Sequence, residues 1–135
     1  MKTLEWKDKY SVGVELIDDQ HKKMVAVINQ LIEVISSAPD KEKIAEIIKQ
    51  LVEYKQFHFD TEEKYFKEFN YEEAEEHIAK HREFTVKLGK LQEEFGDDLM
   101  GFSFALVDFL EDWLVDHLLT MDQKYVECFA SHGLK

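Results

Sequence analysis

Cysteine, proline and glycine are scarce in this chain of 135 residues, which contains one Cys, one Pro and five Gly. A single cysteine, Cys128, excludes a disulfide within the chain. An all-β domain needs more turn-forming Pro and Gly than this, so the scarcity favours long helices. No stretch approaches the roughly 20 consecutive apolar residues of a transmembrane helix, and residues 1–7 lack the apolar run of a secretory signal. We therefore expect an all-α protein without a membrane span, located in the cytoplasm.

Basic residues are also few, with 17 Lys and Arg against 29 Asp and Glu and a net charge of −12 at pH 7. So negative a surface repels nucleic acid and anionic lipid, and we expect neither as a partner. Hydrophobic residues, by contrast, make up 44% of the chain, which is enough to bury a core and excludes a disordered protein. The length matches one domain, so we expect residues 1–135 to form a single, monomeric domain.

Apolar residues recur at helical spacing in four segments of the chain. Turn-forming residues separate these segments at 36–40, 70–71 and 96–103. We expect helices at approximately 18–37, 40–69, 72–95 and 103–130, with N-caps at Asp18 or Asp19, at Asp40 and at Ser103. Residues 1–17 have no sustained period and are expected to lie on the bundle as an N-terminal arm. The pattern predicts an antiparallel, up-down four-helix bundle.

Five of the six histidines lie on the apolar stripes of these segments. An imidazole buried without a partner costs about 1–3 kcal/mol. A single histidine of this kind is more often a core residue bonded to a neighbour, but several together favour a metal site. The two middle segments each carry an i,i+4 pair, which projects from one side of a helix. These pairs are His58 with Glu62 and His77 with His81, while His21 and His117 point inward from the outer segments.

The apolar stripe of the last segment slips by one residue after His117. In a regular helix, His117 and Asp122 would lie about 140° apart around the axis. A π-bulge between them would turn both side chains inward, and such bulges favour functional sites. The alternative is that Asp122 faces solvent. The slipped stripe favours the bulge, and we therefore add Asp122 to the candidate ligands.

Seven candidate ligands are too many for one four-coordinate zinc ion. If both carboxylates bridge two roughly six-coordinate ions, the protein and one bridging oxygen fill all but one of the coordination positions, and one stays open. An imidazole-rich set suits iron among the first-row metals. The sequence therefore predicts a two-iron site, whose candidate ligands are His21, His58, Glu62, His77, His81, His117 and Asp122.

Four stretches with these residues resemble the hemerythrin family, and the resemblance spans nearly the whole chain. They are residues 12–22, 58–63, 77–81 with Phe84, and 113–117 with Asp122 and Tyr125. The spacings His-x-x-x-Glu, His-x-x-x-His and His-x-x-x-x-Asp, after an upstream histidine, are highly specific. The chain departs from the family at Phe66, where members often have Met, and at Glu72, where Pro often follows the tyrosine. Neither departure alters a ligand position.

The resemblance implies a non-haem di-iron centre, with a bridging oxo or hydroxo group, that binds dioxygen reversibly. It assigns His77, His81 and His117 to one iron and His21 and His58 to the other, with Glu62 and Asp122 as bridges. It also suggests a dry ligand pocket walled by Phe59, Trp113 and Leu114. The helical spacing supports this pocket, since the last two residues lie one turn before His117.

Dioxygen carriage, storage or delivery is the function we expect from this resemblance, rather than enzymatic turnover. An oxygen-consuming enzyme is then a possible partner. Two alternatives stay open at this point. The same di-iron site could act as an enzyme on peroxide or nitric oxide, or the chain could be an oxygen or redox sensor that acts in trans.

Overall fold

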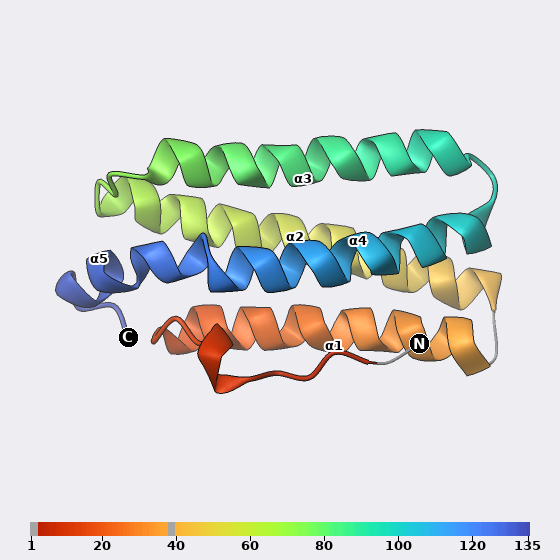
Figure 1. Ribbon diagram of the computed structural model, residues 1–135, viewed down its shortest axis with the longest axis horizontal. Coiled ribbons are helices and arrows are strands. Elements are labelled where there is room, and N and C mark those ends of the chain that lie inside the picture. The colour runs from red at the N-terminus through yellow and green to blue at the C-terminus, as the bar shows by residue number, and fades with distance from the viewer. Residues whose placement is uncertain (1–2, 38–39) are drawn as a thin grey trace.

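The computed structural model describes residues 3–37 and 40–135, and it forms an all-α, antiparallel four-helix bundle (Figure 1). The long helices are α1 (Glu15–Ser37), α2 (Lys41–Glu68), α3 (Ala74–Phe95) and α4 (Leu99–Leu119). Three short helices complete the described chain: η1 (Asp8–Tyr10), η2 (Asp122–Tyr125) and α5 (Val126–Ser131). No strand occurs in the part of the chain that the structure describes. The predicted fold class is confirmed.

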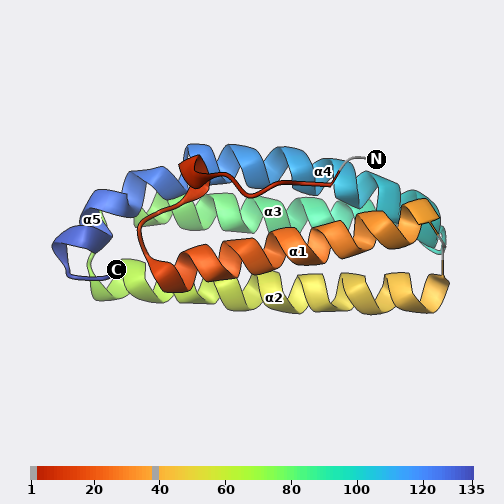
Figure 2. The same cartoon turned by 90° about the horizontal axis from the view of Figure 1, so that it is seen from below.

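The N-terminal arm runs along the bundle beside α1 and α4 (Figure 2). The backbone N–H of Leu4 donates to Asn29 Oδ1 at 2.7 Å, and Asn29 Nδ2 donates to Leu4 O at 2.9 Å. Further along the arm, the carboxylate of Asp18 accepts hydrogen bonds from the Val12 N–H and the Ser11 hydroxyl. Asp18 therefore fastens the arm. The predicted N-cap at Asp18 or Asp19 is wrong, because α1 already begins at Glu15.

The N-cap predicted for α2 is confirmed, and the N-cap predicted for α4 is wrong. Asp40 accepts from the backbone N–H groups of the first turn of α2, as expected of an N-cap. α4 begins at Leu99, not at Ser103, and its N-cap is Asp98, which accepts from the Gly101 N–H at 3.0 Å. A Cβ atom at position 101 would collide with the Asp98 carboxylate. The glycine that suggested a loop therefore makes room for the cap.

The apolar faces of the helices form two clusters of buried side chains. The larger one packs the four long helices together, and the smaller one joins the start of α1 and the end of α2 to η2 and α5. Phe59 of the larger cluster stacks on His81, with ring centroids 3.8 Å apart, and Phe66 of the smaller cluster lies 4.7 Å from His77. The histidines thus lie in a polar layer between two apolar regions. None of the helices in the described ranges is long and apolar enough to cross a membrane.

The π-bulge predicted between His117 and Asp122 is wrong. α4 ends at Leu119, and the chain continues into the 3-10 helix η2, which begins at Asp122. The chain leaves the α-helix before η2, at the turn residues Thr120 and Met121, and the backbone at Thr120 has φ −109° and ψ −66°. Asp122 is fully buried. The inward position that the slipped stripe suggested is therefore present, with a break between α4 and η2 in place of the bulge.

The side chain of Gln123 closes this break in the helix. Its Nε2 donates to the carbonyl of Leu118 at 3.2 Å, which satisfies a backbone acceptor that lies beside the break. The same nitrogen lies 3.2 Å from the carbonyl of Ser11 in the arm. The arm and the break are thus held together by one amide, and the position of Asp122 depends on both.

Deleting one residue between Leu118 and Met121 is expected to prevent iron binding while the bundle stays helical. The deletion rotates Asp122 by about 100° and moves its carboxylate out of the polar layer. Iron per chain after reconstitution, together with far-UV circular dichroism, measures the effect. Deletion of Gly133, which follows α5, is the matched control and should leave the iron content unchanged. A variant that lacks one residue in this stretch and still holds its full iron content would contradict the role of the break.

Candidate metal centre

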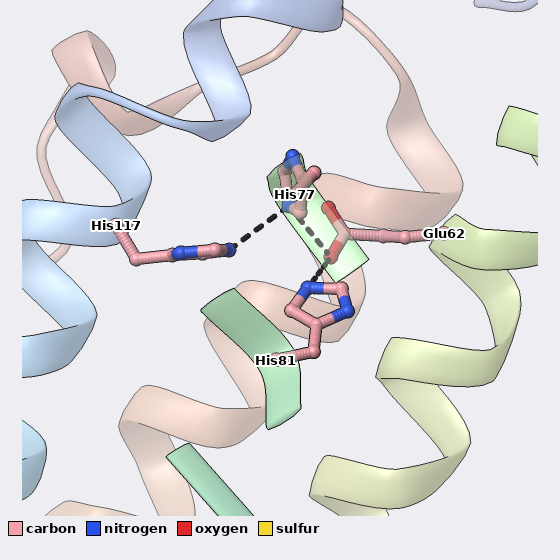
Figure 3. Close-up of side chains that lie close together, drawn as sticks. All are labelled: Glu62, His77, His81 and His117. Atoms are coloured by element: carbon pink, nitrogen blue, oxygen red, sulfur yellow. Dashed lines mark hydrogen bonds and ion pairs between the residues drawn. The ribbon is translucent and has the colours of Figure 1, made fainter. Parts of the chain in front are cut away.

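All seven predicted ligands meet in one buried layer of the bundle, and each is at most 4% exposed. They form two groups that share Glu62, and within each group the potential ligand atoms lie within 4.8 Å of one another. The two groups are Glu62, His77, His81 and His117 (Figure 3), and His21, His58, Glu62 and Asp122. The i,i+4 pairs of α2 and α3 project toward each other because each occupies the inward face of its helix.

The two carboxylates connect the groups in different ways. Asp122 directs Oδ1 toward His117 Nε2, at 3.0 Å, and Oδ2 toward His21 Nε2, at 3.1 Å. Glu62 directs a single atom, Oε1, toward both groups, at 3.1 Å from His81 Nε2 and 3.3 Å from His58 Nε2. Its other oxygen accepts the hydroxyl hydrogen of Tyr125 at 2.6 Å. Asp122 therefore spans the groups with two atoms, and Glu62 with one.

Several of these atoms are buried without a hydrogen-bond partner in the described chain, among them Glu62 Oε1, His81 Nε2 and both Asp122 oxygens. The Nδ1 of His81 lies 3.0 Å from the Glu63 carboxylate, which only accepts, so Nδ1 carries a hydrogen and Nε2 is directed at the site. This Nε2 lies 3.1 Å from Glu62 Oε1. Buried carboxylate oxygens of this kind are unfavourable in a dry site unless a cation lies beside them. The donor set therefore fits metal ions.

A family model, the hemerythrin HHE cation binding domain, matches residues 12–129 of the chain. The chain belongs to the hemerythrin family. Its hemerythrin domain includes all seven predicted ligands, since the matched residues run from the arm into α5.

Curated relatives cover most of this hemerythrin chain. A bacteriohemerythrin of Clostridium acetobutylicum is 31% identical over 126 residues, covering 90% of this chain and 98% of the relative. A bacteriohemerythrin of Pseudomonas aeruginosa is 31% identical over 133 residues, covering 94% and 82%. A solved wild-type hemerythrin aligns with a TM-score of 0.82 over 96% of this chain and 99% of its own, at 24% identity. The structural likeness supports the bundle fold, and the sequence likeness supports the family.

Both carboxylates of the hemerythrin site are ionised. Burial raises the pKa of Glu62, and so does the neighbouring Asp122 carboxylate, but His58 and His81 outweigh both and lower it well below its ordinary value. Burial likewise raises the pKa of Asp122, whereas His117, His21 and His77 lower it well below its ordinary value. Two negative charges in a layer closed to water need compensating cations.

Two of the three predicted pocket residues, Phe59 and Trp113, stack on candidate ligand histidines. The Phe59 ring is nearly parallel to His81, at an interplanar angle of 4°, and Trp113 stacks on His117 with centroids 4.2 Å apart. The two aromatic rings lie 5.7 Å from each other, and Leu114 is buried in the same cluster. Their placement gives the candidate site an apolar wall. Their role toward a ligand stays a prediction.

Sequence reasoning missed the side chains that contact the outer nitrogens of the histidines. Gln20 Oε1 lies 2.7 Å from His58 Nδ1, and Glu63 Oε2 lies 3.0 Å from His81 Nδ1. Gln20 directly precedes His21 and Glu63 directly follows Glu62, so the sequence places both next to a predicted ligand. The sequence could not show which histidine each one contacts, because both contacts cross from one helix to another.

Proposed function

We propose that this chain binds dioxygen reversibly at a non-haem di-iron centre and carries, stores or delivers it rather than turning it over. Its family, its fold and its histidine-rich cluster support oxygen binding at a di-iron site. The observation on which the proposal rests is the pair of buried ligand groups that share one carboxylate. Two groups in contact provide for two metal ions, and five imidazoles suit iron.

In this proposal the three-histidine group, with His77, His81 and His117, holds one iron. The other group, with His21 and His58, holds the second, and Glu62, Asp122 and an oxo or hydroxo group bridge the two. The two oxygens of Asp122, each near a different group, support its bridging role. The second group has one histidine fewer, and its metal would therefore be the one with room for dioxygen.

A pair of ferrous ions, when bound, supplies the electrons for reversible binding of dioxygen. The chain's own residues hold the imidazoles in place and keep the site dry. Phe59 covers one face of His81 and Trp113 one face of His117. An apolar wall of this kind favours reversibility, because water and protons in the pocket promote irreversible oxidation of the site.

We expect the purified protein, reconstituted anaerobically with ferrous iron, to contain two irons per chain. Its optical spectrum should change on exposure to dioxygen and return when dioxygen is removed, over repeated cycles. Metal analysis and the difference spectrum measure both. Saturation at one iron would contradict the di-iron assignment. Turnover of hydrogen peroxide or nitric oxide, with a spectrum that does not return, would instead favour the enzymatic alternative.

A further inference from the structure

Lys55, in α2, is the only Lys or Arg that is buried among the described residues, and it is 4% exposed. Its ammonium forms no ion pair with a carboxylate in the described chain, unlike the exposed lysines Lys80 and Lys124. The cavity that it lines between α2, α3 and α4 has a volume of about 10 Å³, which is room for about one water molecule. A buried charge without a counterion is costly, so its surroundings must stabilise it in another way.

Two oxygen atoms accept from the Lys55 ammonium, and a second hydrogen bond orients each of them. Gln56 Nε2 donates to the Asp60 carboxylate at 2.9 Å, so the amide oxygen is left to accept from Lys55 at 3.3 Å. The Thr85 hydroxyl donates its hydrogen to the carbonyl of His81 at 3.2 Å, and its oxygen accepts from Lys55 at 3.3 Å. An ammonium only donates, so the two acceptors match the charged form of the side chain.

Two aromatic rings complete the surroundings of this ammonium. Lys55 Nζ lies over the ring of Phe59, 5.5 Å from its centroid, and over the ring of Phe84, 5.7 Å from its centroid. The face of an aromatic ring attracts a cation. Burial lowers the pKa of Lys55, and the Asp60 carboxylate acts in the opposite direction. The acceptors, the rings and Asp60 together compensate for the loss of water.

The ring of Phe59 also connects Lys55 to the metal centre. It stacks on His81, with centroids 3.8 Å apart and an interplanar angle of 4°. The ammonium is therefore separated from a candidate ligand by a single aromatic ring. Water and salt screen a buried charge poorly, so the charge of Lys55 acts on the metal layer across this ring.

We propose that the Lys55 ammonium is a fixed positive charge that opposes the accumulation of further positive charge in the metal layer. It weakens the binding of divalent cations by the seven candidate ligands. Once iron is bound, it favours the reduced state, because oxidation removes electrons and leaves more positive charge in the layer. This second effect rests on the proposed function, since reversible dioxygen binding requires a centre that returns to its reduced state.

Titration of the metal-free protein with Co²⁺, followed by its visible absorption, tests the effect on cation binding. Lys55→Met removes the charge and keeps a long side chain, and it should bind Co²⁺ about tenfold more tightly than the wild type does. Lys55→Gln should do the same, which keeps the test valid if Lys55→Met does not fold. Lys49→Met, at an exposed position of α2, changes the net charge equally and should bind as the wild type does, because water screens its charge.

Equal Co²⁺ affinity in the wild type and in both uncharged Lys55 variants would overturn the proposal. Weaker binding in these variants would also overturn it, because Lys55 would then hold His81 in place through Thr85 and would not act by its charge.

An anaerobic redox titration of the iron-loaded protein tests the effect on the reduced state. The midpoint potential of Lys55→Met should lie below that of the wild type, and the potential of Lys49→Met should be unchanged. A Lys55→Met potential equal to that of the wild type would contradict the second effect. Failure of the wild type to bind dioxygen reversibly would overturn the proposed function alone, since neither titration involves dioxygen.

Discussion

Glu62→Ala is expected to leave the protein unable to hold two irons. Glu62 is the only side chain that belongs to both ligand groups within the described chain, and its Oε1 lies close to His58 and to His81. Its loss removes a donor from both metals at once and one of the two negative charges that compensate them. Truncation also leaves the buried Tyr125 hydroxyl without its acceptor. Iron per chain, measured after anaerobic reconstitution with ferrous iron, should fall steeply from two.

The matched control is Glu68→Ala, the same substitution at an exposed position of α2, which should retain two irons per chain. His58→Ala tests one ligand group by itself, because it removes a donor from the two-histidine group only. We expect this variant to lose iron mainly from that group. Two irons in Glu62→Ala, with the helical content of the wild type, would show that the shared carboxylate is not a ligand.

Leu114→Ala is expected to speed autoxidation of the oxygenated protein and to lower its stability. Leu114 is 3% exposed and lies one helical turn before His117, beside the wall formed by Phe59 and Trp113. Truncation opens a cavity next to the candidate open iron position, admits water there and lowers the free energy of unfolding by about 2–5 kcal/mol. The decay of the oxygenated absorption band under air, at matched iron loading, measures the first effect. Denaturant unfolding measures the second.

Leu106→Ala distinguishes a role at the pocket from ordinary core packing. Leu106 is fully buried in the same helix, about two turns before Leu114, and its truncation should destabilise the protein by a similar amount. Its autoxidation rate should nevertheless match the wild type, because the cavity opens away from the histidines. Equal decay rates for Leu114→Ala and the wild type would mean that Leu114 only fills the core and that other residues protect the site.

The inward-facing polar set could be predicted from the sequence because a helix has a fixed period. His58 with Glu62, and His77 with His81, must share a face of their helices whatever surrounds them. Their neighbours on the same stripes are apolar, so that face is the buried one. Asp40 as a cap was equally predictable, since a cap depends only on the three residues that follow it. These local rules were enough to infer the bundle and to bring the ligand candidates into one layer.

The path that turns Asp122 inward required the tertiary structure. The slipped stripe showed that the helical phase changes after His117, but a bulge within a helix and a break between two helices both change it. The break occurs where Gln123 reaches the carbonyl of Leu118 and, in the arm, the carbonyl of Ser11. The contact with Ser11 joins residues more than 100 positions apart, so no local pattern contains it.

The same reason explains why Gln20 and Glu63 were not recognised as parts of the site. Each lies next to a predicted ligand in the sequence but contacts a histidine of another helix. Residue type and spacing determined which atoms can bind metal. The packing of the helices against one another decided which histidine each of these side chains contacts, because a hydrogen bond between helices depends on their relative placement to within a fraction of an ångström.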